Sequence, residues 1–164
     1  MPHFLRLHTR RWLRRGQPGV FCLPAIRRFH GEAAPLLAGA GMLRLLGVQV
    51  DGRPIGCLYA LRLHGRVHYY GGGFDPDWSR YSPGMLLLEQ AITTAMADGD
   101  REFDFLRGTE PYKFRWGAVA RVNQRLLLPF SPTGAWWAAR LAALGPLWTV
   151  GTSHARAPLP HPGT

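Results

Sequence analysis

Five side chains that can move protons or stabilise charge crowd into ten residues of this sequence. They are Asp104, Arg107, Glu110, Tyr112 and Lys113. The carboxylate of Glu110 or Asp104 can take a proton directly or through a water molecule. A cation such as Lys113 or Arg107 can stabilise an oxyanion or hold an anionic substrate, and the hydroxyl of Tyr112 can donate a hydrogen bond. The segment is therefore the first candidate for an active site.

The elements around this cluster are those that usually position a site. Residues 102–106 alternate as a strand, which puts Phe103 and Phe105 on one face and Asp104 on the other. A helix that begins at Pro111 follows, so the cluster lies at the carboxyl end of a strand, where α/β proteins commonly place their sites. Two structural interpretations stay open: an Arg/Glu ion-pair cluster that closes the loop, and Asp104 as a buried partner of Arg107.

Lys113 is the only lysine among 20 Lys and Arg residues. Because Lys is a compact, flexible charge and Arg a planar fork, a site that needs a point charge beside a small oxyanion would keep Lys. We predict that the ammonium faces a cleft between strands 66–72 and 102–106. A Lys113→Met substitution is then expected to lower turnover about 10²-fold and to leave the fold intact.

The remaining elements follow from hydrophobic period and turn residues. Asp51-Gly52 and His64-Gly65 separate apolar runs, as in β-hairpins, and Ser82-Pro83 suits the start of a helix. The sequence predicts helices over 3–15, 24–38, 83–97 and 134–150, and strands over 43–50, 54–63, 66–72, 102–106 and 122–129. The first three strands should form an antiparallel meander, with 102–106 beside the third strand and parallel to it.

The charged segment also carries a family resemblance. The pattern Asp104-x-x-x-Gly108-x-Glu110-x-Tyr112-Lys113-x-x-Trp116 is similar to that of the CelD/BcsL acetyltransferases, which are GNAT-like relatives of the FemAB peptidyltransferases. The resemblance spans about residues 4–130. Further matching pieces are Leu7-His8-x-x-Arg11-Trp12, Phe29-His30, Tyr69-Tyr70-x-x-x-Phe74-Asp75-Pro76 and Ser82-Pro83-Gly84.

The resemblance implies an α/β (α+β) fold with a GNAT-like mixed, mostly antiparallel sheet flanked by helices. A complete GNAT domain begins with a strand before its first helix, and this chain begins inside that helix. Family members also usually carry a second, related half upstream, so the chain resembles only the carboxyl-terminal half of such a protein. We expect the sheet edge at strand 43–50 to be exposed or paired with another molecule, so a homo-oligomer through this edge is an expectation.

The implied activity is transfer of an acyl group, in the first place acetyl, from acyl-CoA to an amine or hydroxyl acceptor in cellulose, exopolysaccharide or cell-envelope biosynthesis. Under this hypothesis the five residues of the first cluster are catalytic. The donor is expected at the carboxyl end of strand 66–72 and the start of helix 83–97, where helix N–H groups suit a phosphate. The expected donor residues are Gly71, Gly72, Arg80, Ser82 and Gly84, and the expected acceptor residues are Arg11, Trp12, His30, Tyr70 and Trp116.

Two departures keep alternatives open. The segment Arg80-Tyr81-Ser82-Pro83-Gly84-Met85 does not match the usual GNAT phosphate loop, and Asp75 and Asp77 add negative charge that would repel a pyrophosphate. FemAB relatives use aminoacyl-tRNA, which a basic first helix would accommodate. A non-catalytic module that binds a partner or a membrane-bound synthase complex is the alternative from another class.

Composition narrows the remaining choices. The chain of 164 residues suits one domain over residues 1–150 followed by a disordered, proline-rich tail over 151–164. Its two cysteines and the absence of a signal sequence favour a reducing, cytoplasmic location. The scattered histidines predict no metal site, and no motif supports DNA binding despite the net charge of +10. Residues 134–150 suit a helix packed on the domain, and a peripheral membrane contact is the minority interpretation.

Overall fold

The computed structural model of the protein describes residues 1–122, 128–143 and 153–159. The chain divides into two compact units, Met1–Asp104 with Pro158–Thr164, and Phe105–Ala157. The predicted domain boundary at residue 150 lies outside the described residues and stays a prediction.

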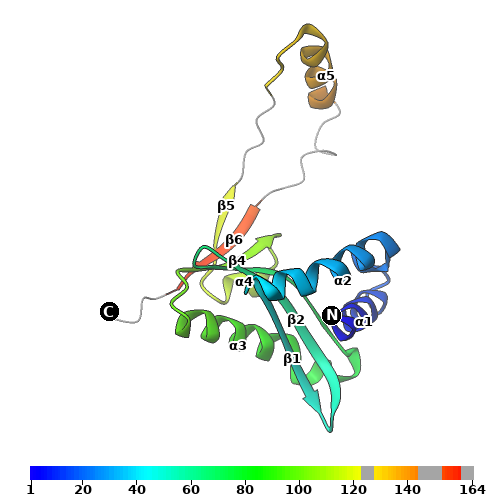
Figure 1. Ribbon diagram of the computed structural model, residues 1–164, viewed down its shortest axis with the longest axis vertical. Coiled ribbons are helices and arrows are strands. Elements are labelled where there is room, and N and C mark those ends of the chain that lie inside the picture. The colour runs from blue at the N-terminus through cyan, green and yellow to red at the C-terminus, as the bar shows by residue number, and fades with distance from the viewer. Residues whose placement is uncertain (123–127, 144–152, 160–164) are drawn as a thin grey trace. The chain divides into compact units, whose positions relative to one another are not determined.

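The first unit contains most of the regular structure (Figure 1). Its elements in chain order are α1 (Pro2–Leu13), η1 (Val20–Cys22), α2 (Pro24–Gly39), β1 (Leu43–Val50), β2 (Arg53–Leu63), β3 (Arg66–Phe74), η2 (Pro76–Tyr81), α3 (Pro83–Ala97) and the start of β4 (Glu102–Arg107). These bounds agree with the predicted helices and strands to within about two residues at most ends.

The sheet of this unit has the predicted topology. Strands β1, β2 and β3 form an antiparallel meander, and β4 pairs with β3 in parallel, with Arg66 opposite Glu102 and His68 opposite Asp104. Positive φ angles at Asp51 (48°) and His64 (51°), each followed by a glycine, match the tight hairpin turns that the sequence predicts. The predicted fold class, a mixed and mostly antiparallel sheet flanked by helices, is confirmed. β1 pairs only with β2 among the described strands.

Strand β3 contains a bulge at Tyr70. The register passes from Ala60 opposite Tyr69 to Tyr59 opposite Gly71, so Tyr70 is an extra residue on β3. A bulge bends its strand and re-aims a side chain, which is why bulges occur beside functional sites. The sequence analysis did not predict this irregularity.

Helices cover both faces of the sheet (Figure 1). On one face, Phe4 and Leu7 of α1 pack with Phe21 against Cys57 and Tyr59 of β2, and all five side chains are buried. On the other face α3 approaches β2, because a Cβ added to Gly56 would meet Leu87 at 3.0 Å. Successive side chains of β2 point to opposite faces, and each face is covered by a helix, which explains why this strand is apolar on both faces.

The second unit contains α4 (Pro111–Phe114), β5 (Val119–Val122), α5 (Pro132–Ala143) and most of β6 (Ser153–Pro158). β5 and β6 pair antiparallel, with Val119 opposite Arg156. The prediction of a disordered tail is thus wrong for residues 153–158. Their backbone N–H and C=O groups find partners on β5, so strand pairing overrides a composition poor in strand-forming residues.

Two further predictions fall partly outside the described residues. The strand predicted over 122–129 begins earlier, as β5, and residues 123–127 are not described. The predicted helix over 134–150 is described as far as Ala143. Within the described residues, the helices are all too short or too polar to cross a membrane.

Candidate functional site

The turn between β4 and α4 is built around the ammonium of Lys113. The Nζ atom donates hydrogen bonds to the backbone carbonyls of Arg107 and Gly108 and lies 2.8 Å from Oε2 of Glu110. Only 2% of Lys113 is exposed. The three oxygens form a small cage for the point charge, a geometry that the fork of an arginine would not fit.

Local backbone geometry brings Glu110 into this cage. Gly108 has a φ of 97°, and a Cβ there would lie 2.4 Å from Oε2 of Glu110. The positive φ favours glycine at position 108, and a Cβ there would displace the carboxylate of Glu110 from Lys113. Partial burial opposes the charged form of Glu110, but hydrogen bonds from Lys113 and the backbone outweigh it and lower the pKa of this carboxyl. Glu110 is ionised at neutral pH, and its side chain is 55% exposed.

The other aromatic and cationic residues of the turn surround this pair. The ring of Tyr112 meets that of Phe105 edge-on, with 6.4 Å between centroids. Trp116 donates its backbone N–H to the carbonyl of Lys113, while its indole Nε1 is buried without a hydrogen-bond partner in the described part of the chain. The turn has the form of the loop-closing ion-pair cluster, with Lys113 in place of arginine. The predicted position of the ammonium in a cleft beside β3 stays a prediction.

Asp104 belongs to the first unit and has a partner there. Its carboxylate is buried and lies 3.6 Å from Nδ1 of His68, the residue opposite it on β3. A strand neighbour in direct register is the closest cross-strand position available. His68 is therefore a contact of Asp104 that the sequence analysis did not predict.

The start of α3, the predicted donor site, follows an unusual residue. Ser82 adopts the left-handed conformation (φ 49°, ψ 48°) and its carbonyl accepts hydrogen bonds from the N–H groups of Met85 and Leu86. Gly84 packs against the Phe74 ring, which a Cβ would meet at 3.5 Å. Arg80 is exposed and stacks on Tyr81, with its guanidinium carbon 4.6 Å from the ring centroid.

The negative charge of Asp75 and Asp77 is neutralised within the first unit. Asp75 is buried and its Oδ2 lies 2.5 Å from Arg10 and 2.8 Å from Arg53, while Asp77 lies 2.7 Å from the same Arg10. Two carboxylates and two guanidinium groups give no net charge. The expectation that these acids repel a pyrophosphate is therefore wrong, because Arg10 from α1 and Arg53 from β2, far away in sequence, neutralise them.

The glycines at the end of β3 serve close packing. A Cβ on Gly72 would lie 2.8 Å from the Tyr69 hydroxyl, and the Gly72 carbonyl accepts a hydrogen bond from Nη1 of Arg11. The Arg11 guanidinium also stacks on Phe74, at 4.7 Å from the ring centroid. Gly71 is less constrained, since its Cβ would lie 3.9 Å from Phe4. Arg11, predicted to bind substrate, thus ties α1 to the end of β3.

Two predicted acceptor residues, His30 and Tyr70, are hydrogen-bonded partners. Nε2 of His30 lies 3.0 Å from the Tyr70 hydroxyl, and Nδ1 lies 3.5 Å from the hydroxyl of Tyr59. Burial lowers the pKa of His30 and raises that of Tyr70, so both are neutral at neutral pH. His30 is buried while Tyr70 is 43% exposed, so Tyr70 is the surface end of the hydrogen-bonded row Tyr59, His30 and Tyr70.

His8 is a member of this cluster that the sequence analysis did not assign to a site. Its ring packs edge-on against Phe21 and tilted against Trp12, which is another acceptor candidate. Its Nδ1 is buried with no hydrogen-bond partner among the described residues. Phe4, His8 and Trp12 lie four residues apart on α1, so the helical period was the signal that could have found it. Burial and the nearby Arg11 lower the pKa of His8 to about 4.

This histidine makes stability depend on pH. Between pH 6.5 and 4 the unfolded chain binds a proton at position 8 that the folded chain does not. Its contribution is complete above pH 6.5 and is lost as the pH falls toward 4. We expect urea unfolding to give a free energy about 1–2 kcal/mol lower at pH 5 than at pH 7. A His8→Phe variant should reduce this difference; an unchanged pH dependence would contradict the assignment to His8.

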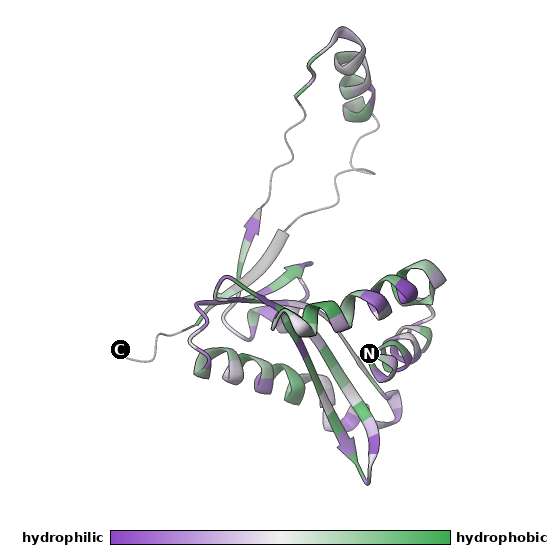
Figure 2. Cartoon of the chain, viewed as in Figure 1, coloured by the Kyte–Doolittle hydropathy of each residue, from purple (hydrophilic) through white to green (hydrophobic). Residues whose placement is uncertain are grey.

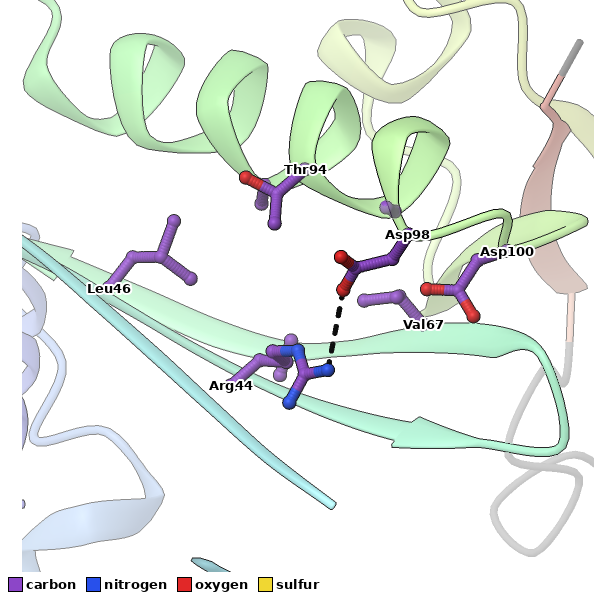
Figure 3. A pocket seen from close by; sticks show the side chains of 9 residues that line it. Arg44, Leu46, Val67, Thr94, Asp98 and Asp100 are labelled. Carbon is purple, nitrogen blue, oxygen red and sulfur yellow. Dashed lines mark hydrogen bonds and ion pairs between the residues drawn. The ribbon is translucent and has the colours of Figure 1, made fainter. Parts of the chain in front are cut away.

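The cavity in Figure 3 lies between α3 and the meander and is not a substrate site. Its walls include Leu46, Val67 and Thr94, and the ion pair between Arg44 and Asp98 lies at its edge. The cavity volume is about 10 Å³, room for about one water molecule. Within the residues that the structure describes, no three His, Cys, Asp or Glu side chains are grouped as a metal would require.

Comparisons with known proteins agree with this architecture. Residues 1–114 match the sequence model of a family described as acetyltransferase (GNAT) domain. A search of curated proteins found no match. The PaiA N-acetyltransferase of Thermoplasma acidophilum, in complex with coenzyme A, is 12% identical with a TM-score of 0.59, over 94% of this chain and 89% of that chain.

Two further solved structures have similar folds. A GNAT family acetyltransferase from Brucella melitensis, in complex with acetyl-CoA, is 17% identical with a TM-score of 0.54, over 73% of this chain and 76% of that chain. A phosphinothricin acetyltransferase from Sinorhizobium meliloti, in complex with acetyl-CoA, is 17% identical with a TM-score of 0.50, over 90% and 75% of the two chains. At these identities the likeness shows the fold.

Proposed function

We propose that this chain, which belongs to the GNAT acetyltransferase family, transfers an acetyl group from acetyl-CoA to an amine or hydroxyl acceptor. The observation that carries the proposal is the family match over residues 1–114, which includes β3, α3 and β4. The Thermoplasma and Brucella proteins with the same fold were solved with coenzyme A and acetyl-CoA, which supports acyl-CoA as the donor.

The first unit offers a physical basis for holding the donor. α3 is 15 residues long and presents its N-terminus beside the end of β3, because Gly84 packs on Phe74. A helix N-terminus carries a partial positive charge that favours a phosphate. With Asp75 and Asp77 neutralised by Arg10 and Arg53, the acids no longer argue against a pyrophosphate there. The exposed Arg80 adds a cation one turn earlier.

For the chemical step, Glu110 is the stronger candidate for the general base. Acyl transfer requires that the acceptor loses a proton, attacks the thioester carbonyl and forms an oxyanion before the thiol of CoA leaves. Glu110 is ionised and half exposed, so it can take that proton. Because Lys113 already binds three oxygens, we assign it first to holding Glu110 in place, and Tyr112 or Arg107 to the oxyanion.

On the acceptor side we assign Tyr70, held by His30, together with Arg11, Trp12 and Trp116. Tyr70 lies on the bulge of β3 and is 43% exposed, so an acceptor can reach it. The finer proposal, a CelD/BcsL-type enzyme of polysaccharide or cell-envelope biosynthesis, rests on the motif from Asp104 to Trp116. The free thiols of Cys22 and Cys57 suit a reducing compartment such as the cytoplasm.

One observation favours a non-catalytic module as the second candidate. The ammonium of Lys113 makes its three polar contacts within its own turn, as expected of a residue that only closes a loop. Such a module would keep the fold without turnover. Aminoacyl-tRNA as an alternative donor has only the seven arginines of residues 1–30 in its support.

The two candidates differ in their response to the donor. Acetyl-CoA at 100 times its dissociation constant is expected to stabilise the folded protein by about 2.7 kcal/mol, because the ligand binds only the folded state. Thermal unfolding with acetyl-CoA, with CoA and with an uncharged tRNA measures this. Stabilisation by tRNA and not by acetyl-CoA would favour the FemAB-like alternative, and no stabilisation by any of them would favour the non-catalytic module.

A further inference from the structure

The segment from Leu13 to Phe29 combines exposed apolar side chains with exposed positive charge. Its large exposed apolar residues are Leu13 (60%), Val20 (51%), Leu23 (53%) and Phe29 (61%). Its exposed arginines are Arg14, Arg15, Arg27 and Arg28, and it contains no acid. We call residues 13–29, which connect the end of α1 with the first half of α2, the basic-apolar segment.

The apolar side chains of this segment are not needed for the core. α2 buries His30 and Ala34 and half-buries Ile26, which lie on one side of the helix at four-residue spacing. Phe29 and, two turns later, Leu36 lie on a different side and are 61% and 75% exposed. Figure 2 shows green apolar and purple polar stretches following one another along α2. Exposed apolar residues grouped along one segment indicate a surface that contacts something else.

The positive charge also has little part in folding, apart from the guanidinium of Arg15, which lies 5.8 Å from the ring centroid of Trp12. Arg10 and Arg62 show how this chain employs an arginine structurally, because each binds a buried carboxylate. Among the four arginines of the basic-apolar segment, the structure describes a single ion pair, between Arg28 and Glu32 at 3.9 Å with both side chains exposed. An exposed pair of this kind contributes little to stability. Glu32 is the only acid in the first 50 residues.

The two features together discriminate between possible partners. A second copy of the same surface would bring like charges face to face, which opposes a symmetric dimer. A polynucleotide would bind the arginines and could stack a base on Phe29, but the exposed Leu13, Val20 and Leu23 side chains would stay in water, since single strands are recognised by stacking on aromatic rings. An anionic bilayer takes both, because its headgroups attract arginine while apolar side chains enter the acyl boundary.

We propose that the basic-apolar segment, residues 13–29, binds the protein peripherally to anionic lipid membranes. The apolar side chains of Leu13, Val20, Leu23 and Phe29 enter the bilayer interface and the four arginines bind lipid headgroups. The proposal concerns where the protein works and does not depend on the acyl-transfer reaction.

Co-sedimentation with vesicles tests this directly with the full chain. The protein is expected to bind vesicles of 70% phosphatidylcholine and 30% phosphatidylglycerol at least tenfold more strongly than pure phosphatidylcholine vesicles, and to lose most of this preference in 0.5 M NaCl. The double variant Arg27→Glu, Arg28→Glu should weaken binding to the anionic vesicles at least tenfold. Phe29→Ser should weaken binding to the vesicles both without added NaCl and in 0.5 M NaCl.

Matched control variants distinguish an effect of this surface on vesicle binding from an effect of the protein's overall charge or apolarity. The double variant Arg66→Glu, Arg115→Glu changes the net charge equally at two exposed positions elsewhere, and Leu86→Ser replaces an apolar residue of similar exposure on α3. Both should bind like the unchanged protein. Circular dichroism of each variant checks that it is folded.

Each of the following results would overturn the proposal. The first is equal binding to both kinds of vesicle, or equal weakening by the matched controls. The second is binding to an uncharged tRNA without binding to anionic vesicles, which would assign the surface to a polynucleotide. A dimer that is seen in sedimentation velocity and that Phe29→Ser dissociates would instead assign the surface to a second copy of the chain. The third is vesicle binding that Trp136→Ala, Trp137→Ala abolishes while the Arg27/Arg28 variant leaves it unchanged, since those exposed tryptophans on α5 would then be the contact.

Discussion

Lys113→Met is expected to lower the stability of the protein by about 3 kcal/mol and its turnover at least 10²-fold. The substitution removes a buried ammonium that donates to the carbonyls of Arg107 and Gly108, at about 1–3 kcal/mol for each carbonyl left without a partner. It also releases Glu110, the proposed base, from its position. Urea unfolding measures the first effect, and CoA release in an acyl-transfer assay measures the second. The earlier expectation of an intact fold is thereby revised.

Glu110→Gln is the matched control for this prediction. It removes the ion pair but leaves Lys113 bound to the two carbonyls, and the side chain of Glu110 is 55% exposed, so the stability should change by less than about 1 kcal/mol. Turnover should still fall if Glu110 is the base. Unchanged stability of Lys113→Met would contradict the observed cage, and full activity of both variants would remove the turn from the mechanism.

Gly73→Ala is expected to destabilise the first unit by about 4 kcal/mol or more. A Cβ at this position would lie 2.2 Å from the backbone nitrogen of His8 and 2.6 Å from Cα of His8 and from the carbonyl carbon of Leu7. These are backbone atoms of α1, so the whole helix would have to leave the sheet and take the buried Phe4 with it. The midpoint of urea unfolding measures the loss.

Gly31→Ala is the control for the glycine substitution itself. Gly31 lies inside α2 and a Cβ there would have nothing within 4 Å. Alanine favours a helix over glycine by up to about 1 kcal/mol, so this variant should be as stable as the unchanged protein or more stable. If Gly73→Ala unfolded at the same urea concentration as Gly31→Ala, the close approach of α1 to β3 would be refuted.

The meander and the parallel β4 could be predicted from sequence because local signals agreed with the tertiary arrangement. The dipeptides Asp51-Gly52 and His64-Gly65 specify tight hairpins, and Ser82-Pro83 marks the start of α3. Strand β6 could not be predicted, because residues 153–158 lack strand-forming residues and end in Pro158, and their strand depends on pairing with β5.

The sequence predicted which residues form the candidate site but not which atoms they contact. The spacing from Asp104 to Lys113 identified a polar turn, but the cage of Lys113 depends on backbone carbonyls, which carry no sequence signal. The neutralisation of Asp75 depends on Arg10 and Arg53, which are 65 and 22 residues away. His68 beside Asp104 followed from the register of β3 and β4, which the hydrophobic pattern alone does not determine.

The central claim is that the chain binds acetyl-CoA at the end of β3 and the start of α3. Titration of acetyl-CoA followed in the amide NMR spectrum tests it most directly, because it reports both binding and place. We expect saturable shifts at one site per chain, largest for Gly71, Gly72, Ser82 and Gly84. Saturable shifts confined to other residues, or none at millimolar acetyl-CoA with the protein folded, would contradict it.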